Sequence, residues 1–367
     1  ICSGVLLFFK SCAILNTKEK AISTGSGYMT RNYKVASMFA GIGGICLGFK
    51  RAGADIVWAN EIDKFACTTY RENFGSDYLV EGDIRDISVE DIPDFDILTS
   101  GFPCQAFSIA GYQKGFKDER GHLFFETLRI LEGKKPRAFF IENVKNLVSH
   151  DSGKTFRIIY DALKEAGYHI RYQVMNSMEY GNVPQNRERI YIVGFINKEE
   201  CNRFYFPDPI PLTKTIDDIV NKEVKQDDKY YYDSSSKYYD MLNKSMTKED
   251  TIYQLRRVYV RENKSKVCPT LTANMGTGGH NVPLIRDKYG IRKLTPRECL
   301  LFQGFPESFK IPENVSDAQL YKQAGNSVTV PVIERIASNM ISVMRDWDSR
   351  SEHVYTQEGL DSTAIAL

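Results

Sequence analysis

After Met29 the chain alternates short apolar runs with longer stretches that have the periodicity of amphipathic helices. The apolar runs, each of a length that suits a buried strand, lie at residues 34–39, 56–59, 94–99 and 138–141. The helical stretches lie at residues 46–52, 64–74, 122–132 and 154–166. Strands that alternate with helices of this length indicate a parallel sheet covered on both faces. The pattern therefore predicts an α/β fold with a doubly wound, mostly parallel sheet, to which residues 172–176 and 189–195 add further strands.

The alternation stops near residue 207 and resumes near residue 296. The chain between these positions is polar, weakly periodic and rich in tyrosine, and a long apolar helix is predicted afterwards, over residues 330–344. An insertion into one α/β domain explains this order. We predict the following division of the chain: an extension before the first methionine at 1–28, a large domain at 29–205, a smaller inserted domain at 206–290, a return to the large domain at 291–347 and a tail at 348–367.

Composition narrows the class of protein only slightly. The 48 Lys and Arg residues and 47 Asp and Glu residues leave a net charge of +1, which excludes a polybasic tail-like protein but allows local basic surfaces. No apolar run approaches the roughly 18 residues of a membrane span. The eight cysteines are scattered, with no C-x-x-C pair and no histidine at zinc spacing, so we expect neither a metal site nor a disulfide framework. A reducing cytoplasm suits this pattern.

A glycine cluster after the first predicted strand is the first candidate for ligand binding. Gly41, Gly43 and Gly44 lie between that strand and a helix, where backbone can approach a ligand at the sheet's carboxyl edge. The dinucleotide pattern G-x-G-x-x-G fails, because its third glycine falls on Cys46. A tight turn would explain such a loop equally well, but Glu61 follows the second strand at the spacing of a ribose-binding acid. With Asp83 as a further acid, the pattern favours a nucleoside ligand without a diphosphate, for which S-adenosylmethionine is the obvious candidate.

Four further residues fall where later strands meet the same edge. Cys104 follows the strand at 94–99 in Gly-Phe-Pro-Cys-Gln, and Glu142 follows the strand at 138–141. Arg187 and Arg189, two residues apart, can face one side of the extended segment that leads into a later strand. Taken singly, each has an ordinary explanation: a buried thiol, a helix-capping acid, a surface ion pair. Their convergence on one edge favours a catalytic site with Cys104 as nucleophile.

The chain resembles the cytosine-C5 DNA methyltransferases, and most closely the small bacterial restriction–modification type. The motifs that carry the resemblance occur in the family's order at residues 39–44, 101–108, 142–144, 185–189, 297–299, 304–306 and 323–328. Within the insert, only residues 270–273 resemble the family, in its target-recognition domain. The resemblance implies a Rossmann-like, S-adenosylmethionine-dependent catalytic domain that carries an inserted target-recognition domain.

The resemblance also implies a mechanism. The Cys104 thiolate would add to C6 of cytosine and make C5 nucleophilic, with Glu142 bonded to N3 and the exocyclic amine. Arg187 would contact the base carbonyl oxygen and lower the thiol pKa, and Arg189 would support that site and the DNA backbone. The target cytosine must be flipped out of the duplex. The glycine-containing segment 104–121, with Gln105 and Ser108 as DNA contacts, resembles the family's mobile loop.

For the cofactor, the resemblance implies that Phe39 stacks on the adenine, Glu61 holds the ribose and Asp83 reads the adenine amine. Asn326 would lie near the methionine end. The remaining residues expected at the cofactor site are their neighbours Gly41, Gly43, Ile62, Ile84, Pro103 and Ser327.

A basic segment hidden by the near-zero total charge predicts where DNA binds. Residues 253–297 contain ten basic residues and two acidic ones, a local charge of +8, which is typical of a phosphate-binding surface. A solvated surface is the alternative for any single run of charge. The glycine-rich stretch 276–281 suits a loop that approaches a groove. Our candidate DNA contacts in the insert are Arg256, Arg257, Thr270, Asn274, His280 and Asn281.

Two alternatives share this fold: a tRNA cytosine-5 methyltransferase and a non-catalytic homologue that only binds DNA. The second should have lost Cys104, Glu142 or the glycine loop, and all are present. A nicotinamide oxidoreductase is disfavoured by the missing third glycine. We expect a bacterial, cytoplasmic monomer that acts on double-stranded DNA, with a cognate restriction endonuclease as a separate protein and no membrane partner.

Overall fold

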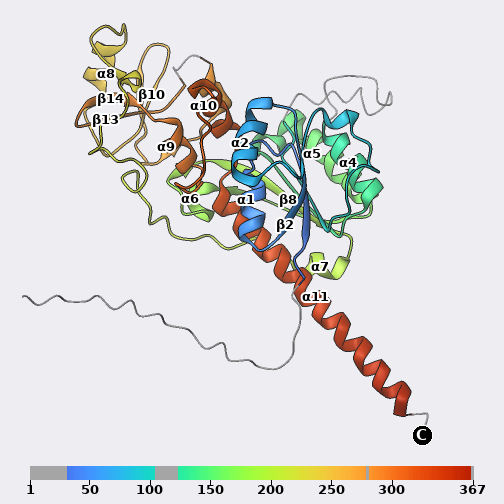
Figure 1. The fold of residues 1–367 in the computed structure, drawn as a ribbon. Helices are drawn as coiled ribbons and strands as arrows, with labels where there is room; N and C mark the ends of the chain where they lie inside the picture. Colours follow the sequence, from blue (N-terminus) through green and yellow to red (C-terminus); the bar gives the residue numbers. More distant parts are fainter. Residues whose placement is uncertain (1–30, 104–122, 278–280, 365–367) are drawn as a thin grey trace, which may run out of the picture. The chain divides into compact units, whose positions relative to one another are not determined.

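The computed structural model describes residues 31–103, 123–277 and 281–364, with side chains up to residue 350. The described residues from Asn32 onward form one compact unit. A seven-stranded sheet lies at its centre, in the order β3-β2-β1-β4-β5-β8-β6 (Figure 1). The strands of this sheet are β1 (Lys34–Met38), β2 (Asp55–Glu61), β3 (Leu79–Glu81), β4 (Ile97–Ser100), β5 (Ala138–Val144), β6 (His169–Asn176) and β8 (Glu188–Phe195).

Six of the seven strands run in one direction, and β8 runs in the opposite direction. β1, β2, β3, β4 and β5 pair in parallel, whereas β8 is antiparallel to both β5 and β6. The predicted doubly wound, mostly parallel sheet is therefore confirmed. Because β8 runs backwards, its first residues lie beside the last residues of β5, and Arg189 pairs with Val144. Residues 142–144, which were expected to follow a strand, are themselves the end of β5.

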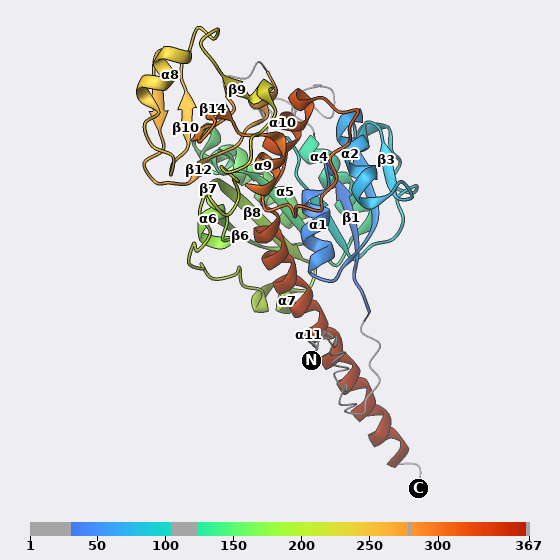
Figure 2. The same cartoon turned by 60° about the vertical axis from the view of Figure 1, so that its left-hand side comes forward.

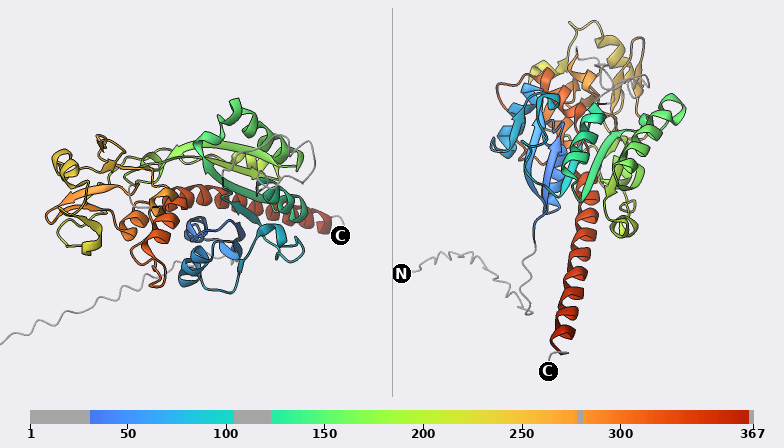
Figure 3. Two further views of the ribbon diagram at one scale, coloured as in Figure 1. Left: turned by 90° about the horizontal axis from the view of Figure 1, so that it is seen from above. Right: turned by 90° about the vertical axis from the view of Figure 1, so that its right-hand side faces the viewer.

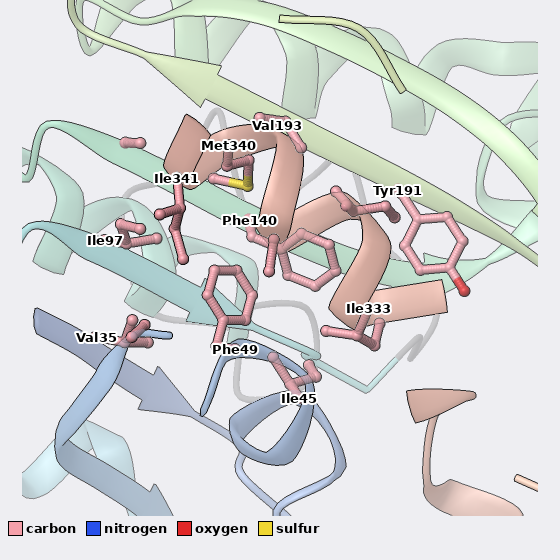
Figure 4. Packing of buried hydrophobic residues seen from close by; sticks show 14 of the residues in the cluster. Val35, Ile45, Phe49, Ile97, Phe140, Tyr191, Val193, Ile333, Met340 and Ile341 are labelled. Carbon is pink, nitrogen blue, oxygen red and sulfur yellow. The ribbon is translucent and has the colours of Figure 1, made fainter. Parts of the chain in front are cut away.

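Helices cover both faces of the sheet, as the alternating pattern predicts. On one face α1 (Gly44–Arg51) packs with the long α11 (Val330–Ala364), and Phe49, Phe140 and Ile333 meet in the core between them (Figure 4). The opposite face is covered by α4 (Leu123–Lys134) and α5 (Lys154–Glu165). The other helices beside the sheet are α2 (Lys64–Phe74), α6 (Ser177–Tyr180) and α7 (Lys198–Arg203). Helix α11 continues well past the predicted residue 344 into the expected tail, and its last turns extend beyond the sheet (Figure 3).

The polar, tyrosine-rich insert contains a second sheet, which the hydrophobic pattern does not reveal. Its strands are short and antiparallel, in the order β11-β10-β13-β14-β9. Their bounds are Tyr231–Tyr232 (β9), Tyr253–Leu255 (β10), Val260–Glu262 (β11), Leu284–Asp287 (β13) and Gly290–Lys293 (β14). Helix α8 (Tyr239–Ser245) packs on this sheet through Leu242 and Met246. Strands of two to four residues are too short for alternation to appear in the sequence.

The chain between the two sheets ties them together. A parallel pair joins β12 (Cys268–Pro269), from the insert, to β7 (Gln185–Asn186), which leads into β8. Helices α9 (Pro296–Leu301) and α10 (Asp317–Asn326) follow the insert and lie between it and the large sheet (Figure 2). The last part of the chain, in α11, packs with α1 on the large sheet. The division of the chain into domains stays a prediction.

A buried ion triad organises the C-terminal end of the insert. Arg292 is fully buried and bonds Asp287 at 2.7 Å and both oxygens of Glu298 at 2.7 and 2.8 Å. Glu298 also completes a capping box with Thr295 at the start of α9. One guanidinium therefore fixes the last hairpin of the insert against the helix that follows it.

Replacing Arg292 by methionine leaves two buried carboxylates without their cation. Removal of one partner from a buried ion pair costs about 3–5 kcal/mol, so we expect Arg292→Met to lower the free energy of unfolding in urea by that amount. Lys288→Met breaks the exposed pair with Glu223 and serves as the control, with an expected loss of roughly 0–1 kcal/mol. Equal losses in the two variants would contradict this role of Arg292.

Candidate functional site

The glycine loop after β1 contains an uncommon backbone conformation. Phe39 and Gly41 have φ values of 54° and 56°, a region that residues with a side chain rarely occupy. Strain of this kind in a non-glycine residue is typical of ligand-binding turns. A Cβ on Gly43 would lie 2.2 Å from the ring of Phe74, so only glycine fits there. Gly43 therefore lets the loop pack closely against the end of α2.

Glu61, at the end of β2, holds this loop in place. Its Oε2 accepts a hydrogen bond from Gly41 N at 2.8 Å, and its Oε1 accepts from Ile62 N and Asp63 N at 2.9 and 2.8 Å. A carboxylate can accept about four hydrogen bonds. Glu61 therefore keeps capacity for one further donor, while its orientation is fixed by the backbone.

Asp83 follows β3 and caps a short 3-10 helix through Arg85 N. Both of its oxygens also accept hydrogen bonds from the Arg85 guanidinium, which lowers the pKa of Asp83. Asp83 is therefore ionised at neutral pH and held in one orientation. Arg85 has no special signal in the sequence, and only the structure reveals this pairing.

These residues line a cavity of about 660 Å³ at the carboxyl edge of the sheet. That volume is within the range of small-molecule sites. Ile62 also lines the cavity, and it is 63% exposed, whereas isoleucine is usually buried. The predicted residues brought together on this cavity are Phe39, Gly41, Glu61, Ile62, Asp83, Ile84, Pro103, Glu142, Arg187, Arg189, Asn326 and Ser327.

Gly43 is the one predicted cofactor residue that falls behind the loop, against Phe74. Cys104, Gln105, Ser108 and His280 lie outside the described residues. The approach to Cys104 is described, however. Asn143 Nδ2 donates to Phe102 O at 2.9 Å, and Phe102 is buried, so β5 fixes the segment that leads to the cysteine.

Glu142 and Arg189 form an ion pair in the wall of the cavity. Arg189 Nε lies 3.1 Å from Glu142 Oε1, where the antiparallel β8 meets the end of β5. This oxygen is buried and accepts no hydrogen bond from the described residues. Burial raises the pKa of Glu142, and the charges of Arg189 and Arg187 partly offset that rise. The carboxyl group thus has a free acceptor beside a fixed cation.

Arg187 is buried and mainly bonded to the protein's own backbone. Its Nη1 donates to Leu271 O at 2.8 Å, and its Nη2 donates to Gly325 O at 3.3 Å and to Ser327 O. Burial and the nearby Arg189 lower the pKa of Arg187 to about 9, so it stays charged at neutral pH. Nε is its one donor without a hydrogen bond among the described residues. The assignment of Arg187 to a base carbonyl stays a prediction.

Residues of the C-terminal segment, at the end of α10, also line the cavity. A Cβ on Gly44 would lie 2.7 Å from Ser327 Oγ, so the first helix and the end of α10 are in close contact. Lys322 Nζ pairs with Asp63 Oδ2 at 2.6 Å, and Gln323 Oε1 accepts from Thr69 Oγ1 at 2.9 Å. Asp63, Lys322 and Gln323 line the cavity but were missed by the sequence reasoning. Only Asp63 has a local signal, as the N-cap of α2.

The basic segment of the insert presents fewer free cations than its composition suggests. The predicted charge of +8 included Arg292, which is buried between Asp287 and Glu298. Lys266 and Lys288 pair with Asp250 and Glu223, acids that lie outside residues 253–297. The estimate of available charge was therefore too high, because folding neutralises part of it.

The predicted DNA contacts of the insert differ in exposure. Arg256 and Arg257 are exposed in the turn between β10 and β11, beside Val258, which is 84% exposed. Asn274 and Asn281 are exposed and bonded, with Asn281 Nδ2 donating to Asn274 O at 3.2 Å. Thr270 Oγ1 donates to Asn186 O at 2.7 Å, so this hydroxyl has an internal partner. Their roles in DNA binding stay predictions.

Among the described residues, no group of His, Cys, Asp and Glu is arranged to hold a metal ion. In the same part of the chain, no helix combines the length and the apolar composition that a membrane crossing requires.

Comparison with known sequences gives one consistent result. A family model described as "C-5 cytosine-specific DNA methylase" matches residues 33–342. Type II methyltransferase M.Bsp6I of Bacillus sp. (strain RFL6) is 61% identical over 314 residues, which cover 85% of this chain and 99% of that protein. Type II methyltransferase M.HhaI of Haemophilus parahaemolyticus is 39% identical over 321 residues, covering 83% and 92%.

Solved structures show the same fold at lower identity. A crystal structure of Spodoptera frugiperda DNMT2 matches with a TM-score of 0.67 and 22% identity, covering 84% of this chain and 99% of that one. The Dnmt2 methyltransferase of S. pombe matches with a TM-score of 0.64 at 22% identity, covering 85% and 99%. These two structures support the fold alone.

The raised pKa of Glu142 predicts how stability depends on pH. Below the ordinary carboxyl pKa, Glu142 is protonated in both the folded and the unfolded chain, so its ionisation does not lower the free energy of unfolding. As pH rises, the unfolded chain ionises first, and the folded state loses stability relative to it. We therefore expect the free energy of unfolding of Glu142→Gln, relative to the unmodified protein, to increase from pH 5 to pH 8. A flat or reversed trend for Glu142→Gln would contradict this account.

Proposed function

Because the chain belongs to the C-5 cytosine-specific DNA methylases, we propose that the cavity binds S-adenosylmethionine beside a flipped cytosine of double-stranded DNA. The chain is a DNA cytosine-5 methyltransferase, and family and fold imply that S-adenosylmethionine is its methyl donor. The observation that carries the residue assignments is the ion pair of Glu142 with Arg189, because both residues line the same cavity as Glu61.

The cavity fits a nucleoside cofactor. Glu61 has one acceptor position left, which suits a ribose hydroxyl, and Asp83 supplies an oriented carboxylate for the adenine amine. The half-buried Phe39 and the exposed Ile62 offer apolar surfaces for the adenine ring. Asn326 and Ser327, at the end of α10, would contact the methionine part. When bound, S-adenosylmethionine supplies a methyl group on a sulfonium centre.

We assign the target base to the Glu142 end of the cavity. Cytosine C5 is a poor nucleophile until a group adds at C6, and Cys104 would provide that group as its thiolate. The raised pKa of Glu142 suits a carboxyl that shares a proton with cytosine N3 and accepts from the exocyclic amine. Arg189 would then hold Glu142 in place as negative charge develops on the ring. Loss of the C5 proton and elimination of Cys104 would complete the reaction.

The insert would read the DNA sequence. The exposed Arg256 and Arg257 suit phosphate contacts, and the loop that contains Asn274, His280 and Asn281 suits contacts to base edges. Gln105 and Ser108 would contact the base from the segment after Cys104. We name this insert the target-recognition domain on these grounds.

The names of the relatives favour DNA over tRNA as the substrate. The 61% and 39% identical proteins are both named Type II methyltransferases, which is the class of restriction–modification systems. We therefore propose that the protein is a bacterial enzyme that protects DNA from a separate cognate endonuclease. Its cytoplasmic location and its monomeric state stay predictions. The tRNA methyltransferase and the non-catalytic DNA-binding homologue receive no comparable support.

The test is to map 5-methylcytosine by bisulfite sequencing after incubation of the full chain with mixed-sequence duplex DNA and S-adenosylmethionine. We expect methylation of one short sequence motif. Cys104→Ser should abolish it, because a hydroxyl is far less nucleophilic than a thiolate, and Glu142→Gln should reduce it about 10²-fold or more through lost transition-state stabilisation.

Lys225→Met, at an exposed ion pair of the insert outside the basic segment 253–297, is the control and should keep the motif unchanged. Transfer to tRNA instead of DNA would support the tRNA alternative. Binding of cofactor and DNA without transfer to either would make the protein a non-catalytic homologue and overturn the mechanism.

A further inference from the structure

Arg187 lies at a junction of three chain segments that are far apart in the sequence. Its guanidinium donates to Leu271 O in the insert and to Gly325 O and Ser327 O at the end of α10. Residues 270–273 belong to the predicted target-recognition domain, and residues 325–327 line the cofactor cavity. The buried guanidinium of Arg187 therefore contacts the backbone of the insert and the backbone of the turn that lines the cofactor cavity.

Gln185 reinforces the junction from the same strand face. Its side-chain Oε1 accepts from Leu271 N at 3.1 Å, so Leu271 is held at its N–H by Gln185 and at its carbonyl by Arg187. Gln185 Nε2 donates to Phe302 O at 2.6 Å. Residues at alternate positions of an extended segment face one side. Along this segment, Gln185 contacts the insert and Arg187 contacts both the insert and the cofactor turn. Two residues further, Arg189 pairs with Glu142.

The two segments that Arg187 joins are also in direct contact. A Cβ on Gly325 would lie 2.1 Å from the carbonyl carbon and 2.3 Å from the oxygen of Thr272. Backbone therefore packs on backbone at this point, and neither segment can shift without the other. Among the described residues, no side chain separates them here.

We propose that Arg187 is a positioning residue that joins segment 268–273 of the insert to the cofactor-binding turn 325–327, so that DNA and cofactor bind with coupled affinity. This inference rests on the proposed function, which places DNA on the insert and the cofactor in the cavity. Because the two segments are joined, DNA that favours one position of segment 268–273 also favours one position of the turn, through the guanidinium and the contact between Gly325 and Thr272. The cofactor then binds more tightly to the position that DNA favours.

The test measures binding, with S-adenosylhomocysteine as the cofactor probe. Its dissociation constant is determined by calorimetry with and without a duplex that contains the motif found by methylation mapping. Couplings between sites are typically 5–150-fold, and we expect the unmodified protein to bind the probe at least about 5-fold more tightly with DNA. Arg187→Lys keeps the charge but cannot span three carbonyls from one ammonium, so the ratio should fall to about 1.

Two further variants keep this test decisive. Gly325→Ala keeps the Arg187 side chain but forces Thr272 away from the turn, and it should abolish the coupling in the same manner. Arg335→Lys is the matched control, because Arg335 also bridges two backbone carbonyls, those of Tyr180 and Asp208, but away from the cavity. It should leave the ratio unchanged. Thermal unfolding confirms that each variant is folded at the temperature of the measurement.

Three results would overturn the proposal. The first is equal affinity of the unmodified protein for S-adenosylhomocysteine with and without the duplex. The second is full coupling in Arg187→Lys or Gly325→Ala. The third is an Arg187→Lys variant that keeps the coupling but has a lower single-turnover rate at saturating ligands, as expected if Arg187 contacts the base. Absence of methylation in the unmodified protein would instead refute the proposed function.

Discussion

The antiparallel contact of β8 with β5 is the constraint on which the rest of the site depends. In a parallel sheet only the carboxyl ends of strands reach the ligand edge, so the glycine loop and Asp83 follow strands of the same direction as β5, which Glu142 helps to end. An arginine at the beginning of a strand can join them only if that strand is reversed. β8 is reversed, and its Arg189 therefore meets Glu142 at 3.1 Å in a buried wall of the cavity. Without that reversal the carboxylate would be buried with no cation, at a cost that folding would rarely tolerate.

The same segment explains why the chain must return to its first domain after the insert. Residues 185–189 bond the insert on one side and the end of α10 on the other, and α10 closes the cofactor cavity. Helix α11 then fills the face of the sheet beside α1, where Ile333 packs with Phe49 and Phe140. The C-terminal segment thus completes both a binding site and a hydrophobic core, and the insert is held in place by the strand that carries the arginines.

The sequence predicted the features that depend on local pattern. Six of the seven strands of the large sheet and its main helices follow from apolar periodicity, whereas the three-residue β3 was missed. The cofactor loop and the acids at the edge follow from glycine and carboxylate positions, and the motifs supplied Arg187 and Arg189. Features that depend on folding could not be read in this way. The insert's strands are too short to show a period, Arg292 counted as a surface cation although it is buried, and the partners of Arg187 lie 84 to 140 residues away. Lys322 and Gln323 line the cavity only because α10 returns to α2.

The central claim is that Cys104 adds to C6 of a flipped cytosine at the Glu142 end of the cavity. Mass spectrometry of the protein with a duplex that carries 5-fluorocytosine at the target position tests it most directly. Fluorine cannot leave C5 as a proton does, so the bond between the Cys104 sulfur and C6 should persist after methyl transfer. The account predicts a covalent protein–DNA species, dependent on S-adenosylmethionine, with the strand attached at Cys104. Attachment at another residue, or no covalent species under conditions where ordinary cytosine is methylated, would contradict it.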